Sequence, residues 1–287
     1  MMTETPVDRI REEILRVEGT VWVLHAPTGV PVYDFAFDRL LACRRPLRLP
    51  GEIEAIARVG AIADYDAYHA RWAEAGVRLV HSPDEHRRAS ELPLWYPLLE
   101  DLTPRSLWGR QPPGADVVGS ELGWPIFVKG SRQTSHHRRS LSIVEGPDAY
   151  VRVLEAYERD PILHWQEIVC RSYVPLRLVE DVALDRVPSS FEFRTFWWRG
   201  RLVGFGPYWW EGKRYEVTAS EWDGAVEVAE EAARRLNVPF LVVDVAQTAA
   251  GRWLVIECND GQEAGYAGVP PIGLWQRLVV AERQRAP

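Results

Sequence analysis

Cysteine is scarce in this 287-residue sequence, and its pattern excludes two kinds of stabilised domain. The three cysteines, Cys43, Cys170 and Cys258, are an odd number and contain no CxxC pair. Neither a disulfide framework nor a structural zinc site is therefore expected. A reducing compartment, the cytoplasm, suits such a chain.

Long apolar runs are also missing. No uninterrupted run approaches the roughly 18 residues that a membrane span requires. The first twenty residues hold five charged side chains between Asp8 and Glu13 and no apolar segment. The sequence thus predicts neither an export signal nor a membrane anchor.

An excess of basic charge is absent as well. The 34 basic and 41 acidic residues leave a formal charge of -7, which argues against a nucleic-acid partner, although a local basic site is compatible with it.

The chain has no internal repeat, and its 46% hydrophobic content is too high for a disordered protein. We expect a soluble globular protein of one or two domains, and nothing in the sequence indicates its oligomeric state.

The first part of the chain alternates strand and helix patterns. Residues 1–19 form a charged, loosely held lead-in. Strands and helices then alternate, at residues 20–24, 66–75, 77–80 and 82–99. This order predicts a small α/β unit with a parallel sheet over residues 20–120, which ends where the composition shifts toward proline and glycine between residues 103 and 123.

The second part, residues 121–287, has a different pattern. Strands are predicted at residues 125–129, 141–144, 162–169, 192–198, 202–205, 240–246 and 252–258, and helices at 147–159 and 223–236. The last two strands form a hairpin. Antiparallel hairpins with helices packed on one side indicate an α+β domain.

The last hairpin carries acids where a buried strand rarely admits them. Alternation along the strand puts Val255, Glu257 and Asn259 on one face, and Asp244 interrupts the apolar partner strand, where an unpaired carboxylate is costly. Two carboxylates and an amide oxygen suit Mg²⁺, which takes one or two carboxylates together with substrate phosphates. The alternative is a pair of exposed or salt-bridged carboxylates.

Two cations and one strand complete the set of candidates. Lys129 ends an apolar strand just before a polar loop, from which its ammonium can reach a phosphate. Arg194 lies among aromatic residues and needs an anionic partner, either a phosphate or Glu192 on the same face. The backbone of residues 164–169 is suited to read a flat heterocycle, unless this is an ordinary sheet strand.

The order of these motifs resembles that of the ATP-grasp superfamily. The segments are WPIFVKG, HWQEIV, FEFRTFWWRGRLVG and FLVVDVAQTAAGRWLVIECND, which together cover about residues 121–262. The preceding unit, which ends in DLTPRSLW, resembles the companion domain of such proteins. The resemblance implies a nucleotide bound between two subdomains.

The resemblance also implies roles for individual residues. Lys129 contacts nucleotide phosphate, and Arg194 faces the phosphoryl group and substrate. The remaining implied contacts are the adenine hinge at Gln166, Glu167, Ile168 and Val169, and the Mg²⁺ ligands Asp244, Glu257 and Asn259.

The loop after Lys129 departs from the family pattern. A second phosphate lysine is usual there, but residues 131–140 contain none. Arg138 or Arg139 is the candidate replacement, which suggests a small bacterial or phage branch of the superfamily, and the alternative is a solvated basic loop. Lys213 is a further cationic candidate for nucleotide binding.

Aromatic and glycine-rich segments mark a second region of interest. Tyr208, Trp209 and Trp210 are consecutive, so at least one is exposed or lines a pocket. The glycine-containing segment 261–268 follows the acidic hairpin directly and allows a second substrate to approach closely, or is a plain strand-to-helix connection.

The sequence therefore predicts an ATP- and Mg²⁺-dependent ligase. It would join a small-molecule or peptide carboxylate to an amine through an acyl phosphate and release ADP and phosphate. Two rival hypotheses are a phosphotransferase on the same fold and a nucleotide-binding module without turnover. The sequence identifies neither the acid nor the amine.

Overall fold

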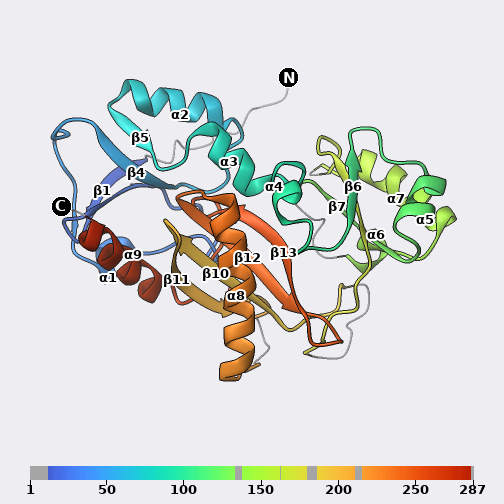
Figure 1. The fold of residues 1–287 in the computed structure, drawn as a ribbon. Coiled ribbons are helices and arrows are strands. Elements are labelled where there is room, and N and C mark those ends of the chain that lie inside the picture. The colour runs from blue at the N-terminus through green and yellow to red at the C-terminus, as the bar shows by residue number, and fades with distance from the viewer. Residues whose placement is uncertain (1–11, 133–137, 162, 180–185, 211–214, 286–287) are drawn as a thin grey trace, which may run out of the picture.

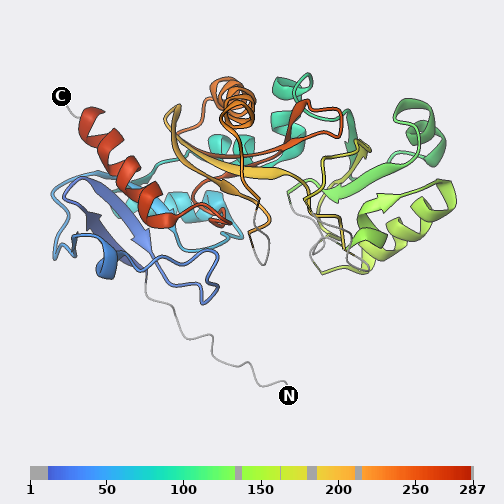
Figure 2. The ribbon, with the colours of Figure 1, turned by 90° about the horizontal axis from the view of Figure 1, so that it is seen from below.

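Three sheets in succession organise the chain (Figure 1). The computed structural model describes residues 12–132, 138–161, 163–179, 186–210 and 215–285. Seen from below, the N-terminal unit and the middle unit lie at opposite ends of the molecule, with the C-terminal sheet between them (Figure 2). In the described part of the chain, no helix has both the length and the apolar character needed to cross a membrane.

The N-terminal unit is a five-stranded sheet in the order β3-β1-β2-β4-β5. Its strands are β1 (Glu13–Val17), β2 (Val21–His25), β3 (Cys43–Arg44), β4 (Ile53–Arg58) and β5 (Val77–Leu79), and its helices are α1 (Phe37–Leu40), α2 (Tyr65–Glu74), α3 (Pro83–Ser90) and α4 (Leu92–Leu99). Strands β2, β4 and β5 are parallel, whereas β1 is antiparallel to β2 and β3. The α/β character is confirmed, but the sheet is mixed rather than parallel.

Three strands of this sheet, β1, β3 and β4, were not expected. Strand β1 lies inside the segment predicted as a lead-in; its exposed Arg16 lies between the buried Leu15 and Val17, which is the pattern of a strand with one exposed face. Strand β4 contains two alanines and one glutamate, residue types with low β-propensity. Its burial between two neighbouring strands outweighs that propensity.

The middle unit is an antiparallel sheet in the order β6-β9-β7-β8. It comprises β6 (Ser106–Gly109), β7 (Ile126–Gly130), β8 (Ile143–Val144) and β9 (Ile168–Ser172), with α5 (Ala115–Glu121), α6 (Arg139–Ser142) and α7 (Pro147–Arg159). Residues 141–144 were predicted as a strand, but only Ile143 and Val144 form one, because the two residues before them belong to α6.

The strand predicted at residues 162–169 is displaced toward the C-terminus. Asp160 holds the chain in a turn before it, since its side chain accepts from Leu163 N at 3.1 Å and its carbonyl from His164 N at 3.1 Å. Such local bonds compete with a sheet ladder. Strand β9 therefore begins only at Ile168.

The C-terminal sheet is antiparallel in the order β11-β10-β12-β13. Its strands are β10 (Glu192–Trp198), β11 (Arg201–Pro207), β12 (Phe240–Gln247) and β13 (Trp253–Asp260), and its helices are α8 (Ala219–Leu236) and α9 (Pro271–Arg285). Helix α8 has a capping box formed by Thr218 and Glu221 and ends at Asn237, whose φ of 48 is left-handed. The predicted α+β organisation is confirmed.

The two faces of the C-terminal sheet pack against different partners. Helices α4 and α8 cover one face through the cluster that contains Trp95, Ala229 and Val243. On the other face, one cluster joins β1 and β2 to α9 and includes Leu15, Val17, Trp275 and Leu278. The first strands of the chain thus share a core with its last helix (Figure 2).

Candidate active site

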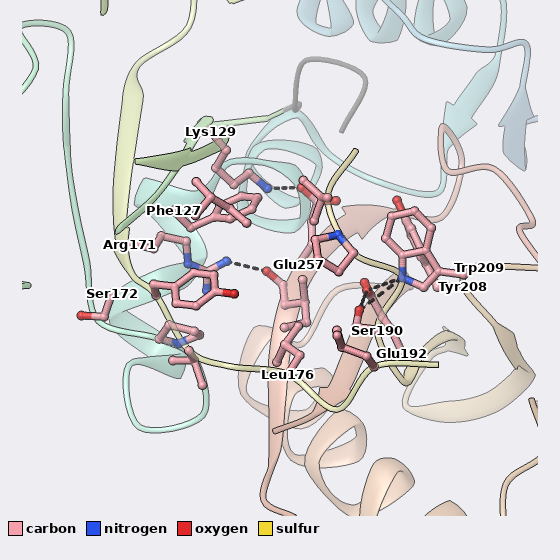
Figure 3. Close-up of a pocket in the computed structure, with 18 residues that line it drawn as sticks. Phe127, Lys129, Arg171, Ser172, Leu176, Ser190, Glu192, Tyr208, Trp209 and Glu257 are labelled. Atoms are coloured by element: carbon pink, nitrogen blue, oxygen red, sulfur yellow. Dashed lines mark hydrogen bonds and ion pairs between the residues drawn. The ribbon is translucent and has the colours of Figure 1, made fainter. Parts of the chain in front are cut away.

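A cavity of about 140 Å³ lies between the middle sheet and the C-terminal sheet (Figure 3). Its apolar walls include Phe127 from β7 and Ile256 from β13. Its polar lining is Lys129, Arg171, Ser172, Ser190, Glu192, Tyr208 and Glu257. The cavity therefore has an apolar part and a charged part, built from both sheets.

Lys129 and Glu257 form an ion pair that joins the two sheets across the cavity (Figure 3). Both side chains are largely buried, with exposed fractions of 5% for Lys129 and 20% for Glu257. Burial works to raise the pKa of Glu257, but the Lys129 ammonium outweighs it and holds that pKa below its ordinary value. Phe127 shares a face with Lys129, because alternate residues of a strand point the same way.

Arg194 and Asp244 form a second, fully buried ion pair. They are direct cross-strand neighbours on β10 and β12. Arg194 Nε donates to Asp244 Oδ1 at 2.8 Å and Nη2 to Oδ2 at 2.7 Å, while Nη1 donates to the Gly265 carbonyl at 2.7 Å. Burial works against the charged guanidinium, yet Asp244 raises the pKa of Arg194. The partner of Arg194 is thus Asp244 rather than Glu192.

The three predicted metal ligands lie together. Asp244 is the cross-strand neighbour of Glu257, and the side chain of Asn259 hydrogen-bonds to Glu257. Val255 does not share their face, because the register shifts between Asp244 and Val245. Such a bulge breaks the alternation, and Val255 packs with Cys258 against α8 instead.

Glu192 is a buried carboxyl in the cavity wall. Ser190 Oγ donates to its Oε2 at 2.8 Å and Trp209 Nε1 donates to the same oxygen at 3.1 Å (Figure 3). Burial, reinforced by the nearby Asp244, raises its pKa to about 8. The acid is therefore mostly protonated at neutral pH in the folded protein.

Replacing Glu192 with glutamine is expected to stabilise the protein at high pH. The folded-state pKa of about 8 exceeds the ordinary 4.5, so the unfolded chain loses this proton first, and stability falls as the pH rises between these values. Glutamine keeps an acceptor for Ser190 and Trp209 but does not ionise. We expect a gain on the order of a few kcal/mol above about pH 8 and little gain near pH 4. Urea unfolding measures it, and a gain independent of pH would contradict this account.

The residues expected as the adenine hinge lie at the far end of β9 from the cavity. Gln166 Oε1 accepts from Arg132 N at 2.9 Å, and the Glu167 carbonyl accepts from Ser131 N at 2.9 Å. Ile168 and Val169 pair with β6 on one side and β7 on the other. Because β9 begins later than predicted, the cavity lining instead comes from residues 171–174.

Arg171 is a cavity residue that the sequence analysis missed. Its Nη1 donates to the Ile256 carbonyl at 2.7 Å and Nη2 bonds to Thr103 Oγ1, whereas its buried Nε has no partner among the described residues. Burial lowers its pKa to about 10. Arg171 lies near the end of β9. The predicted strand ended at residue 169, so Arg171 fell outside it and was not considered.

The remaining predicted cations lie elsewhere or outside the described residues. Arg139 begins α6, is about half exposed and lies 3.6 Å from Glu145. Lys213 falls in a range that the structure does not describe. Tyr208 and Trp209 line the cavity, and Trp210 is 46% exposed, as the run of aromatics predicted. The guanidinium of Arg194 lies 5.1 Å from the centre of the Tyr208 ring.

A family model described as an ATP-grasp domain of the R-two-K clade, family 3, matches residues 121–278, more than half of the chain. The chain belongs to this ATP-grasp family. The resemblance seen in the motifs of this ATP-grasp protein is thereby confirmed. A comparison with curated protein sequences finds no match.

Solved structures share the fold of this ATP-grasp protein at low identity. A D-alanine–D-alanine ligase from Bacillus anthracis complexed with ATP is 14% identical with a TM-score of 0.58, covering 81% of this chain and 79% of the other. A RimK domain ATP-grasp protein from Sphaerobacter thermophilus is 16% identical with a TM-score of 0.53, covering 79% and 80%. The ATP-grasp ligase PsnB is 18% identical with a TM-score of 0.50, covering 77% and 67%.

Proposed function

We propose that this ATP-grasp protein is an ADP-forming ligase that joins a carboxylate to an amine. The observation that carries the proposal is the gradation along the cavity. Apolar walls at Phe127 and Ile256 lead to a charged end at Lys129 and Glu257, and both sheets contribute to each part. This arrangement suits a nucleotide whose base enters the apolar part and whose phosphates meet the charged part.

The base would be held between the two sheets. Phe127 and Ile256 offer apolar surfaces from opposite walls, and residues 172–174 line the same space. We therefore place the reading of the heterocycle at these residues rather than at 166–169. Glu192 would meet the sugar, since the oxygens of its carboxyl group accept hydrogen bonds from hydroxyls, and Lys129 would bind phosphate as a point charge.

The oxygen donors at the charged end fit Mg²⁺. Asp244, Glu257 and Asn259 supply carboxylate and amide oxygens, the ligand type that Mg²⁺ prefers. In the described ranges no group of three His, Cys, Asp or Glu side chains could hold a metal by itself, so substrate phosphates would complete the coordination. The bound ion would neutralise the charge of the terminal phosphates.

The chemistry follows from position and charge. A carboxylate oxygen of the acid attacks the γ-phosphorus, the bond to the β-phosphate oxygen breaks, and ADP leaves. The amine then attacks the acyl carbonyl, inorganic phosphate leaves and the amine loses a proton. Arg194, held by Asp244 and the Gly265 carbonyl, would be the cation that meets the phosphoryl and acyl oxygens. The structure of the ligase PsnB holds a minimal precursor, Mg and ADP. For this chain we propose a small-molecule or peptide acid as the substrate class.

The proposal is tested by the products made from ATP. With candidate acids and hydroxylamine in place of the amine, we expect ADP, phosphate and a trapped hydroxamate, only in the presence of Mg²⁺. Replacing Glu257 with glutamine should weaken the Mg²⁺-dependent thermal stabilisation by ATP. ADP without hydroxamate indicates a phosphotransferase, binding without ADP indicates a module without turnover, and stoichiometric AMP excludes the mechanism.

A further inference from the structure

A buried polar cluster lies where the N-terminal unit meets the end of β13. His86 of α3 is 1% exposed and Asp260, the last residue of β13, is also 1% exposed. His86 Nδ1 lies 2.9 Å from Asp260 Oδ2, and His86 Nε2 lies 2.8 Å from Arg132 Nη2. The cluster therefore joins the first residues of the loop after β7 to the acidic hairpin.

The hydrogen-bond partners of His86 determine which of its ring nitrogens carries the proton. A guanidinium only donates, so Nε2 of His86 must accept from Arg132, and Nδ1 must carry the proton that is donated to Asp260. The ring stacks on Tyr65 at 4.0 Å between centroids. His86 is thus a neutral bridge in a chain from Arg132 to Asp260.

Other groups fix Asp260 and surround Arg132. His81 lies 2.9 Å from Asp260 Oδ2 through Nδ1, while its Nε2 accepts from Phe240 N. Gln262 N donates to Asp260 Oδ1 at 2.7 Å. Glu91 approaches Arg132 Nε only to 3.7 Å. A guanidinium carries five donors, and among the residues that the structure describes the hydrogen-bond partner of the Arg132 side chain is His86, through Nη2.

The cluster lies beyond the charged end of the cavity on both sheets. Along β7 the chain passes from Phe127 in the cavity wall to Lys129 and then to Arg132. Along β13 it passes from Ile256 through Glu257 to Asp260, three residues or about 10 Å further on. A nucleotide whose base lies at Phe127 and Ile256 would direct its terminal phosphate toward this cluster.

We propose that Arg132 is the second phosphate-binding cation of this protein and that His86, anchored by Asp260, is the residue that positions it. This inference rests on the proposed nucleotide site. It assigns to Arg132 the contact that the sequence suggested for Arg138 or Arg139. The phosphate in question is the terminal one, because the cluster lies farther from the cavity than Lys129.

The test compares the affinity for Mg²⁺·AMPPNP with that for Mg²⁺·ADP, measured by calorimetry. Arg132→Gln should weaken AMPPNP binding by about 10- to 100-fold, the size of a lost charge-assisted contact, and should leave ADP binding nearly unchanged. His86→Phe, which keeps the ring on Tyr65, should have the same selective effect. His86→Gln, which retains one donor and one acceptor, should remain within about threefold of the wild type.

Controls separate positioning from general damage. The double variant His86→Phe with Arg132→Gln should be no weaker than Arg132→Gln alone, because His86 acts through Arg132. His69→Phe on α2 is the matched control, and Arg132→Gln keeps the test available if His86→Phe does not fold. Additive losses, equal losses for both nucleotides, or unchanged AMPPNP binding overturn the inference. A wild-type protein that binds neither nucleotide refutes the proposed function itself.

Discussion

Replacing Arg194 with methionine is expected to cost both stability and catalysis. Asp244 would remain as a buried carboxylate without its bidentate partner, which typically destabilises a protein by about 3–5 kcal/mol. The charge that we propose meets the transferred phosphoryl group would also be lost, so kcat should fall by roughly 10² to 10³. Denaturant unfolding measures the first effect, and ADP formation at saturating ATP measures the second.

A double variant separates these two roles of Arg194. Combining Arg194→Met with Asp244→Leu replaces a buried ion pair by apolar groups, which is often neutral for stability. We expect the double variant to regain most of the stability of the wild type without regaining activity. Near-normal kcat in Arg194→Met would restrict Arg194 to a structural role.

Replacing Lys129 with alanine is expected to act mainly on ATP binding. In the proposed role, Lys129 holds phosphate equally in the ground state and the transition state, so its loss should raise the KM for ATP while kcat changes little. The effect should be large, about 10²-fold, because Glu257 would then face the triphosphate without its partner ammonium. Steady-state kinetics over a range of ATP concentrations give both constants.

The matched variant for Lys129 is its combination with Glu257→Gln. The glutamine removes the uncompensated charge, so the double variant should bind ATP without Mg²⁺ better than Lys129→Ala does. If Lys129→Ala instead lowers kcat and leaves KM unchanged, Lys129 contacts charge that develops only during transfer.

The fold was predictable wherever periodicity was strong. Helix α7 and strand β10 begin and end at the predicted residues, and the hairpin of β12 and β13 was predicted from two apolar runs joined through residues 248–251. Strand β4 was missed because its alanines carry little β-propensity and only its neighbours stabilise it. Strand β9 was misplaced because Asp160 stabilises a turn that apolar periodicity does not reveal.

The sequence predicted only those site residues whose place follows from their position along a single strand. Lys129, Asp244, Glu257 and Asn259 lie together as expected, because each occupies a defined position on a strand. The Arg194–Asp244 pair depends on register between strands 50 residues apart in sequence, which one strand alone does not disclose. The contact between Arg132 and His86 likewise joins residues 46 positions apart in sequence, so neither segment alone discloses it.

The core shared by the first strands and the last helix has a consequence for synthesis on the ribosome. One face of the N-terminal sheet is covered by residues no later than Leu79, whereas the other face packs against Trp275 and Leu278 of α9. Because chains emerge from the N-terminus, the face that carries Leu15 and Val17 is buried only after α9 has been synthesised. The N-terminal unit therefore completes its core only after α9 has been made, although its own strands are made first.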